Sequence, residues 1–75
     1  MFEDITRAIQ RGSANRQKAV TIHFQILTNA DRLRGITGED FCKRVGIEPT
    51  WAIEFKKMMN LADMLKQNGI DVQAP

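Results

Sequence analysis

The chain has 75 residues, a formal net charge of +2 and a sequence pI near 9.0. Its 43% hydrophobic and 27% charged residues are ordinary for a globular domain, and a chain this short forms one domain that buries only about 60% of its unfolded surface. No run approaches the roughly 18 apolar residues of a membrane span, and the acidic N-terminus is unlike a signal peptide. We therefore expect a cytoplasmic protein.

The first predicted helix starts at the N-terminus. Phe2, Ile5 and Ile9 recur at helical spacing, with Ala8 beside them. Gly12-Ser13 is a typical break in a helical pattern, so we predict that this short helix ends there.

A longer helix is predicted next, over residues 14–34. Its apolar positions recur every three or four residues and form one stripe, which consists of Ala19, Ile22, Ile26, Ala30 and Leu33. The run AVTIHFQIL is rich in β-branched residues, so a strand is the alternative for that part. We favour a helix because the stripe extends beyond the run, and Gly35 supplies a C-terminal stop.

Residues 37–57 have the features of two helices joined by a tight turn. Thr37 with Asp40 three residues later is close to a capping box, which predicts a helix start. Gly46 can adopt the positive φ of a tight helix exit, and Ile47 would fill the corner. Pro49 has the fixed φ and the missing donor suited to a first helical position. The segment therefore predicts a bihelical corner.

The last predicted helix runs over residues 49–68. One side carries an apolar seam that we expect in the core, made of Trp51, Ala52, Phe55, Met58, Met59, Ala62 and Leu65. At 100° per residue the opposite side presents Thr50, Ile53, Lys57, Asn60 and Met64. Asn68-Gly69 should end the helix in a Schellman arrangement with Ile70 packing back.

These elements predict an all-α fold, a small four-helix domain that contains a helix-turn-helix. We expect one domain over residues 1–70, with the helix-turn-helix at residues 37–68 and a flexible tail at residues 71–75. Basic residues in the first half could form a patch for phosphates or could simply be solvated helix faces; they are Arg7, Arg11, Arg16 and Lys18.

The segment FCKRVGIEPTWAIEF resembles the helix-turn-helix superfamily of small bacterial DNA-binding domains. The pattern of that superfamily is matched at its apolar, small and glycine positions by Phe41, Cys42, Val45, Gly46, Ile47, Ala52 and Phe55. The chain departs from the pattern at Cys42, where alanine is commonest, and at Ala52, where a branched anchor is usual. It also carries acids at Glu48 and Glu54.

The resemblance implies a helix that enters the DNA major groove and a preceding helix that lies near phosphates. It implies that the DNA-binding residues are Lys43, Arg44, Thr50, Ile53, Glu54, Lys57 and Asn60. Since one helix makes few base contacts, we expect a homodimer that reads two half-sites and acts in transcription regulation. Candidates for the dimer surface are Leu61, Met64 and the N-terminal helix.

Two other classes of function compete with DNA binding. A protein-protein interaction module would explain Ile53 and Met64, because methionine beside an aliphatic residue makes an adaptable surface. An enzyme is disfavoured because His23 and Cys42 are the only residues of their types, too few for a zinc site. We expect Cys42 to be a packed hydrophobe, His23 a boundary residue and Trp51 a core residue, with no cofactor, metal or small-molecule substrate.

Overall fold

The computed structural model describes residues 2–72 and consists of four α-helices. They are α1 (Phe2–Ala14), α2 (Lys18–Thr28), α3 (Gly38–Val45) and α4 (Trp51–Gln67). The described part of the chain contains no strand, so the predicted all-α class is confirmed and the strand alternative for AVTIHFQIL is wrong. None of these helices has the length and apolar character needed to cross a bilayer.

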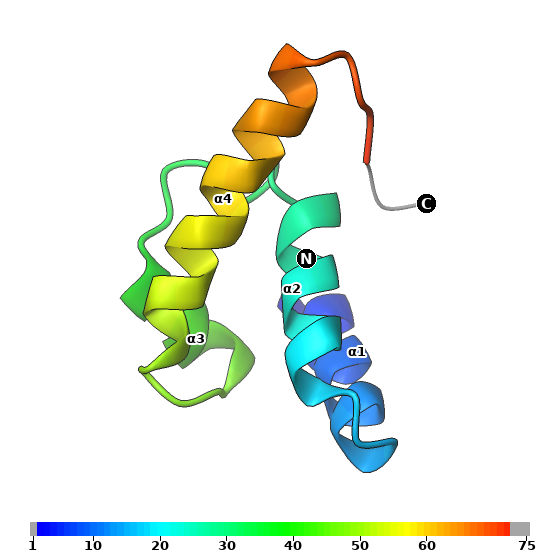
Figure 1. The fold of residues 1–75 in the computed structure, drawn as a ribbon. Helices are drawn as coiled ribbons and strands as arrows, with labels where there is room; N and C mark the ends of the chain where they lie inside the picture. The colour runs from blue at the N-terminus through cyan, green and yellow to red at the C-terminus, as the bar shows by residue number, and fades with distance from the viewer. Residues whose placement is uncertain (1, 73–75) are drawn as a thin grey trace.

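Each helix contacts two others, so the contacts between the helices form a closed ring. Figure 1 shows α3 beside α4, and α1 behind α2. α1 packs on α2, α2 on α4, α4 on α3, and α3 on α1. Within residues 2–72, α1 and α4 make no direct contact and stand diagonally across the domain. Their solvent-facing sides therefore point in different directions.

The core lies inside this ring and receives side chains from every helix. Its buried members are Ile5, Ile9, Ile22, Ile26, Leu33, Phe41, Cys42, Val45 and Phe55. The rings of Phe41 and Phe55 pack with centroids 4.9 Å apart, which joins α3 to α4. Trp51, Ala52, Met58 and Met59 pack against this core, so the predicted seam of the last helix is confirmed over residues 51–59. Ala62 and Leu65, the last two predicted members, are half-buried and line a pocket instead.

The predicted end of the first helix is wrong. α1 continues through Gly12 and Ser13 to Ala14, and Gly12 is buried inside it. A Cβ at Gly12 would collide with the side chain of Thr21, so this glycine allows α2 to approach closely instead of breaking the helix. The chain turns after Ala14 and passes through Arg16, which has a φ of 60°.

The predicted long helix over residues 14–34 is also wrong, because α2 spans only Lys18–Thr28. Thr28 and Asn29 donate side-chain hydrogen bonds to the carbonyls of Phe24 and Gln25, both at 2.8 Å. Such bonds compete with the backbone ladder and favour a helix end. Residues 29–35 form turns, yet Ala30 and Leu33 remain buried as the stripe predicted.

The C-terminal end of α4 agrees with the sequence, whereas the predicted start at Pro49 is wrong. The helix begins at Trp51, two residues after Pro49, because residues 49–50 form a turn closed by the Trp51 N–H donating to the Glu48 carbonyl at 3.1 Å. At the other end Gly69 has a φ of 72°, and the Ile70 N–H donates to the Leu65 carbonyl at 2.9 Å. This is the predicted Schellman arrangement, but Ile70 does not pack back fully and stays 51% exposed. The predicted tail at residues 71–75 lies mostly outside the described residues.

Candidate nucleic-acid interface

The corner between α3 and α4 has the predicted geometry. The Thr37 hydroxyl accepts a hydrogen bond from the Asp40 N–H at 3.1 Å, which caps α3. Gly46 ends α3 with φ 73° and ψ 39°, the left-handed conformation that favours glycine. The Ile47 N–H then donates to the Cys42 carbonyl at 3.0 Å, so the chain leaves the helix in a tight turn.

Cys42 is buried in the contact between the corner and the core, with 2% of its surface exposed. Burial raises the pKa of its thiol, and the nearby Glu39 charge adds to the effect. A thiol in this setting is a poor nucleophile. Cys42 is therefore the packed hydrophobe that we expected.

Glu48 ties the turn to α2. Its carboxylate accepts hydrogen bonds from Lys18 Nζ at 2.9 and 3.0 Å and from Trp51 Nε1 at 3.0 Å. These bonds, the one from Lys18 above all, lower the pKa of Glu48. Lys18 is thus engaged in holding the start of α4, so it does not join Arg7 and Arg11 in a basic patch.

We call the solvent-facing side of α4 the outer face. It comprises Thr50, Ile53, Lys57, Asn60 and Met64, all of which are exposed as the helical spacing predicted. Ile53 is 66% exposed and Met64 is 60% exposed. The face therefore combines two large apolar side chains with hydroxyl, amide and ammonium groups that can donate hydrogen bonds.

The other predicted site residues lie in three different settings. Glu54 is half-buried at the edge of the outer face, with Oε2 3.5 Å from Lys57 Nζ and Oε1 3.7 Å from His23 Nε2. Lys43 is exposed on α3. Arg44 pairs with Asp40 of the same helix at 2.9 Å, and its guanidinium lies 5.1 Å from the ring centroid of Phe2 in α1.

Lys56 is a further candidate that the sequence pattern did not indicate. Lys56 is exposed and, within residues 2–72, it forms no ion pair. It follows Ile53 by three positions and so lies only about 60° from it around the helix. If the outer face had been defined over a wider range of angles around the axis of α4, it would have included Lys56.

The exposed arginines of α1 do not extend the outer face. Arg7 and Arg11 are exposed on α1, which stands diagonally opposite α4. A duplex lying against the outer face would therefore not meet these two side chains. Solvation of the α1 surface is the simpler explanation for their charge.

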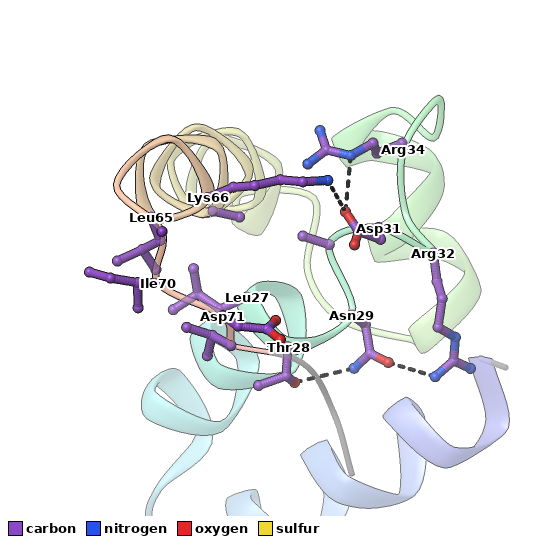
Figure 2. Close-up of a pocket in the computed structure, with 14 residues that line it drawn as sticks. Leu27, Thr28, Asn29, Asp31, Arg32, Arg34, Leu65, Lys66, Ile70 and Asp71 are labelled. Carbon is purple, nitrogen blue, oxygen red and sulfur yellow. Dashed lines mark hydrogen bonds and ion pairs between the residues drawn. The ribbon is translucent and has the colours of Figure 1, made fainter.

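A separate pocket of about 520 Å³ lies between the end of α2 and the C-terminal half of α4 (Figure 2). Its charged groups largely neutralise one another. Asp31 Oδ1 lies 3.3 Å from Arg34 Nε and 3.6 Å from Lys66 Nζ, and Arg34 Nη1 lies 2.8 Å from Asp63. We therefore assign these charges to the stability of the domain and place the candidate interface on the outer face.

A capped helix, a glycine turn and a second helix with a buried seam and an exposed polar face define a helix-turn-helix protein. The family model described as an HTH-like domain matches residues 1–68, and the chain belongs to this family. The match covers all four helices, well beyond the corner that carried the resemblance. Comparison with curated proteins and with solved structures gave no match.

Proposed function

We propose that this protein binds DNA through the outer face of α4 and acts as a transcriptional regulator or accessory factor. The observation that carries the proposal is the division of α4 into a seam packed on the core and an outer face whose exposed side chains can donate hydrogen bonds. In the helix-turn-helix class, the second helix presents such a face to the major groove.

Four residues of the outer face, all except Met64, have a chemical role in this proposal. Ile53 would contact a thymine methyl group, while Lys57 and Asn60 would donate to guanine and adenine or to the backbone. Thr50 would meet a phosphate or a base at the start of the helix. Glu54, at the edge of the face, would accept from a cytosine amine.

The sequence-independent part of the affinity would come from lysines without an internal partner. Lys43 on α3 and Lys56 on α4 are exposed and unpaired among residues 2–72. Arg44 is partly engaged by Asp40 and the Phe2 ring, so we assign it a smaller part than Lys43.

We further propose that the protein acts as a homodimer in the bacterial cytoplasm. One outer face offers few base contacts, and two copies related by a two-fold axis would read two half-sites about 34 Å apart. Leu61 and Met64, exposed toward the C-terminal end of α4, are candidates for the dimer surface. We treat residues 1–70 as the functional domain, with residues 71–75 as a tail and no catalytic site.

The salt dependence of binding tests this function. A dimer that contacts about six phosphates should lose about 10³-fold in DNA affinity between 50 and 200 mM salt. Lys57→Ala should reduce the slope, whereas Lys66→Ala is the matched control, because Lys66 lies near Asp31 and away from the outer face. Failure to retain DNA at 50 mM salt would contradict the proposal.

A protein-interaction module is the second candidate, favoured by the exposure of Ile53 and Met64. Its affinity for a protein partner should change little with salt, because apolar contacts are not screened. Co-purification with and without nuclease separates the two functions. DNA in the untreated sample supports the first, and a stoichiometric protein that survives nuclease supports the second.

A further inference from the structure

α2 carries large apolar side chains on two opposite sides. Ile22 and Ile26 are fully buried in the core, whereas Val20 is 69% exposed and Phe24 is 53% exposed. Phe24 is two positions from both isoleucines, so it lies about 200° from each of them around the helix axis. A helix that is apolar on all sides is ordinarily buried on all sides. In the single chain, the side that carries Phe24 is left uncovered.

We call the uncovered apolar side of this helix the α2 ridge, which consists of Val20, Phe24 and Leu27. Their four-then-three spacing keeps them within about 60° of one another around the axis, as in a helix-helix seam. Leu27 also lines the pocket at the end of α2 together with Leu65 and Ile70, so the apolar surface continues onto the C-terminal end of α4 (Figure 2). An exposed apolar surface of this kind marks an interaction site. The α2 ridge shares no residue with the outer face.

Charges of opposite sign flank the α2 ridge. Residues 19–30 include no Asp, Glu, Lys or Arg. Arg16, just before the helix, is exposed and forms no ion pair within residues 2–72. Asp31, just after the helix, keeps 54% of its side chain exposed beside its intramolecular ion pairs. The ridge is therefore neutral along its length, basic before its first residue and acidic after its last.

We propose that the α2 ridge is the surface through which two copies of this chain form a dimer, with their α2 helices antiparallel about a two-fold axis. In the register where Val20 faces the partner's Leu27, the two Phe24 side chains meet next to the axis. The same register brings Arg16 beside the partner's Asp31, because Arg16 precedes Val20 by four positions and Asp31 follows Leu27 by four. The inference rests on the homodimer of the proposed function and names its surface.

The charge pattern favours a second copy of this chain as the occupant. A two-fold interface brings the same surface of both copies together, so that surface must be complementary to itself. Antiparallel copies of the α2 ridge match apolar to apolar and basic end to acidic end, whereas parallel copies would place like charges together. A helix of 11 residues makes a small interface, so we expect a dissociation constant on the order of 10 µM.

Sedimentation equilibrium of the whole protein without DNA tests the surface. The parent should pass from monomer to dimer as its concentration rises through the dissociation constant. Phe24→Ser removes a central side chain from both copies and should raise this constant about 30-fold or more. Ile53→Ser, on the outer face, is the matched exposed control and should leave it unchanged. Met64→Ser tests the competing dimer surface on α4 and should also leave it unchanged.

Charge reversal at the ends of the ridge tests the antiparallel register. Arg16→Glu and Asp31→Arg should each weaken self-association about three- to tenfold at low salt, because each places like charges together twice in the dimer. Mixing the two variants should restore association, because every pair in the mixed dimer is again of opposite sign. Arg7→Glu, an exposed arginine on α1, is the control and should have no effect.

The outcomes separate this inference from the proposed function. An unchanged dissociation constant in Phe24→Ser, or a dimer broken by Met64→Ser instead, would overturn the α2 ridge and keep the homodimer. A mixture of the two charge variants that associates no better than either variant alone would overturn the antiparallel register. A protein that stays monomeric at every concentration would overturn both this inference and the homodimer, while DNA binding keeps its own test by salt dependence.

Discussion

Gly38 of α3 lies directly against the backbone of Ala52 in α4. A Cβ added to Gly38 would be 2.8 Å from the Ala52 carbonyl oxygen and 3.0 Å from its Cα. The first turns of the two helices therefore touch through their main chains. This contact sets how α4 sits on α3, and with it the direction in which the outer face points.

The contact predicts that Gly38→Ala destabilises the protein. In an ordinary helix this change would stabilise by roughly 0.5–1 kcal/mol, but here the new methyl group meets backbone that cannot rotate away, so we expect a loss of about 1–3 kcal/mol. Urea denaturation measures the difference. Glu39→Ala, an exposed neighbour, should cost less than about 1 kcal/mol. A stabilising Gly38→Ala would disprove the close approach.

Substitutions of Gly46 should be destabilising for a different reason. Its φ is 73°, yet nothing lies within 4 Å of an added Cβ, so the penalty is backbone strain without collision. We expect Gly46→Ala to cost about 1–2 kcal/mol, Gly46→Val to cost more, and Gly46→Asn to cost least. Thermal unfolding of the three variants gives the order. Equal melting temperatures would argue against the left-handed turn.

The corner could be predicted from the sequence because its signals are local. The Thr37 cap and the Gly46 turn each depend on residues within a few positions, and both have the expected geometry. The end of α2 could not be predicted in the same way. Ala30 and Leu33 are buried and keep the helical spacing of the apolar residues, although they lie in turns. The spacing of apolar residues therefore did not distinguish the helix from the turns that follow it.

Phe55→Ala should remove a large share of the stability. Phe55 is 4% exposed and packs on Phe41, so truncation should cost about 3–5 kcal/mol, a large part of the total stability of a domain this small. Phe55→Leu should cost less because it retains most of the apolar contact. Met64→Ala, on the outer face, should stay within about 0.5 kcal/mol of the parent. A mild effect of Phe55→Ala would mean that the seam is misplaced.

Glu48→Gln should change the response of stability to acid. Because Lys18 lowers the pKa of Glu48 in the folded state, the stabilisation is present above the ordinary glutamate pKa of about 4.3 and is lost as the pH falls through the lower folded value. Melting curves should therefore differ between parent and variant at pH 7 and converge near pH 2. A difference that persists at pH 2 would point to a cause other than this ion pair.

The residues of the outer face could be predicted from the helical spacing along α4. The ion pairs between α4, or the turn before it, and α2 could not. The Lys18–Glu48 ion pair joins residues 30 positions apart, and the Glu54–His23 contact joins α4 to α2. Both depend on how the helices pack, which no local pattern encodes. For the same reason, the sequence did not reveal that Arg44 lies against the Phe2 ring of α1, whereas its pair with Asp40 is a local i,i+4 contact within α3.

The central claim is that the outer face of α4 recognises DNA, and selection from a randomised DNA pool tests it most directly. The parent protein should enrich a defined sequence. Lys57→Ala combined with Asn60→Ala should lose that preference, while its melting temperature stays nearly unchanged because both side chains are exposed. Lys66→Ala combined with Gln67→Ala is the matched control on the same helix and should keep the preference. An unchanged preference in the Lys57/Asn60 variant would contradict the assignment.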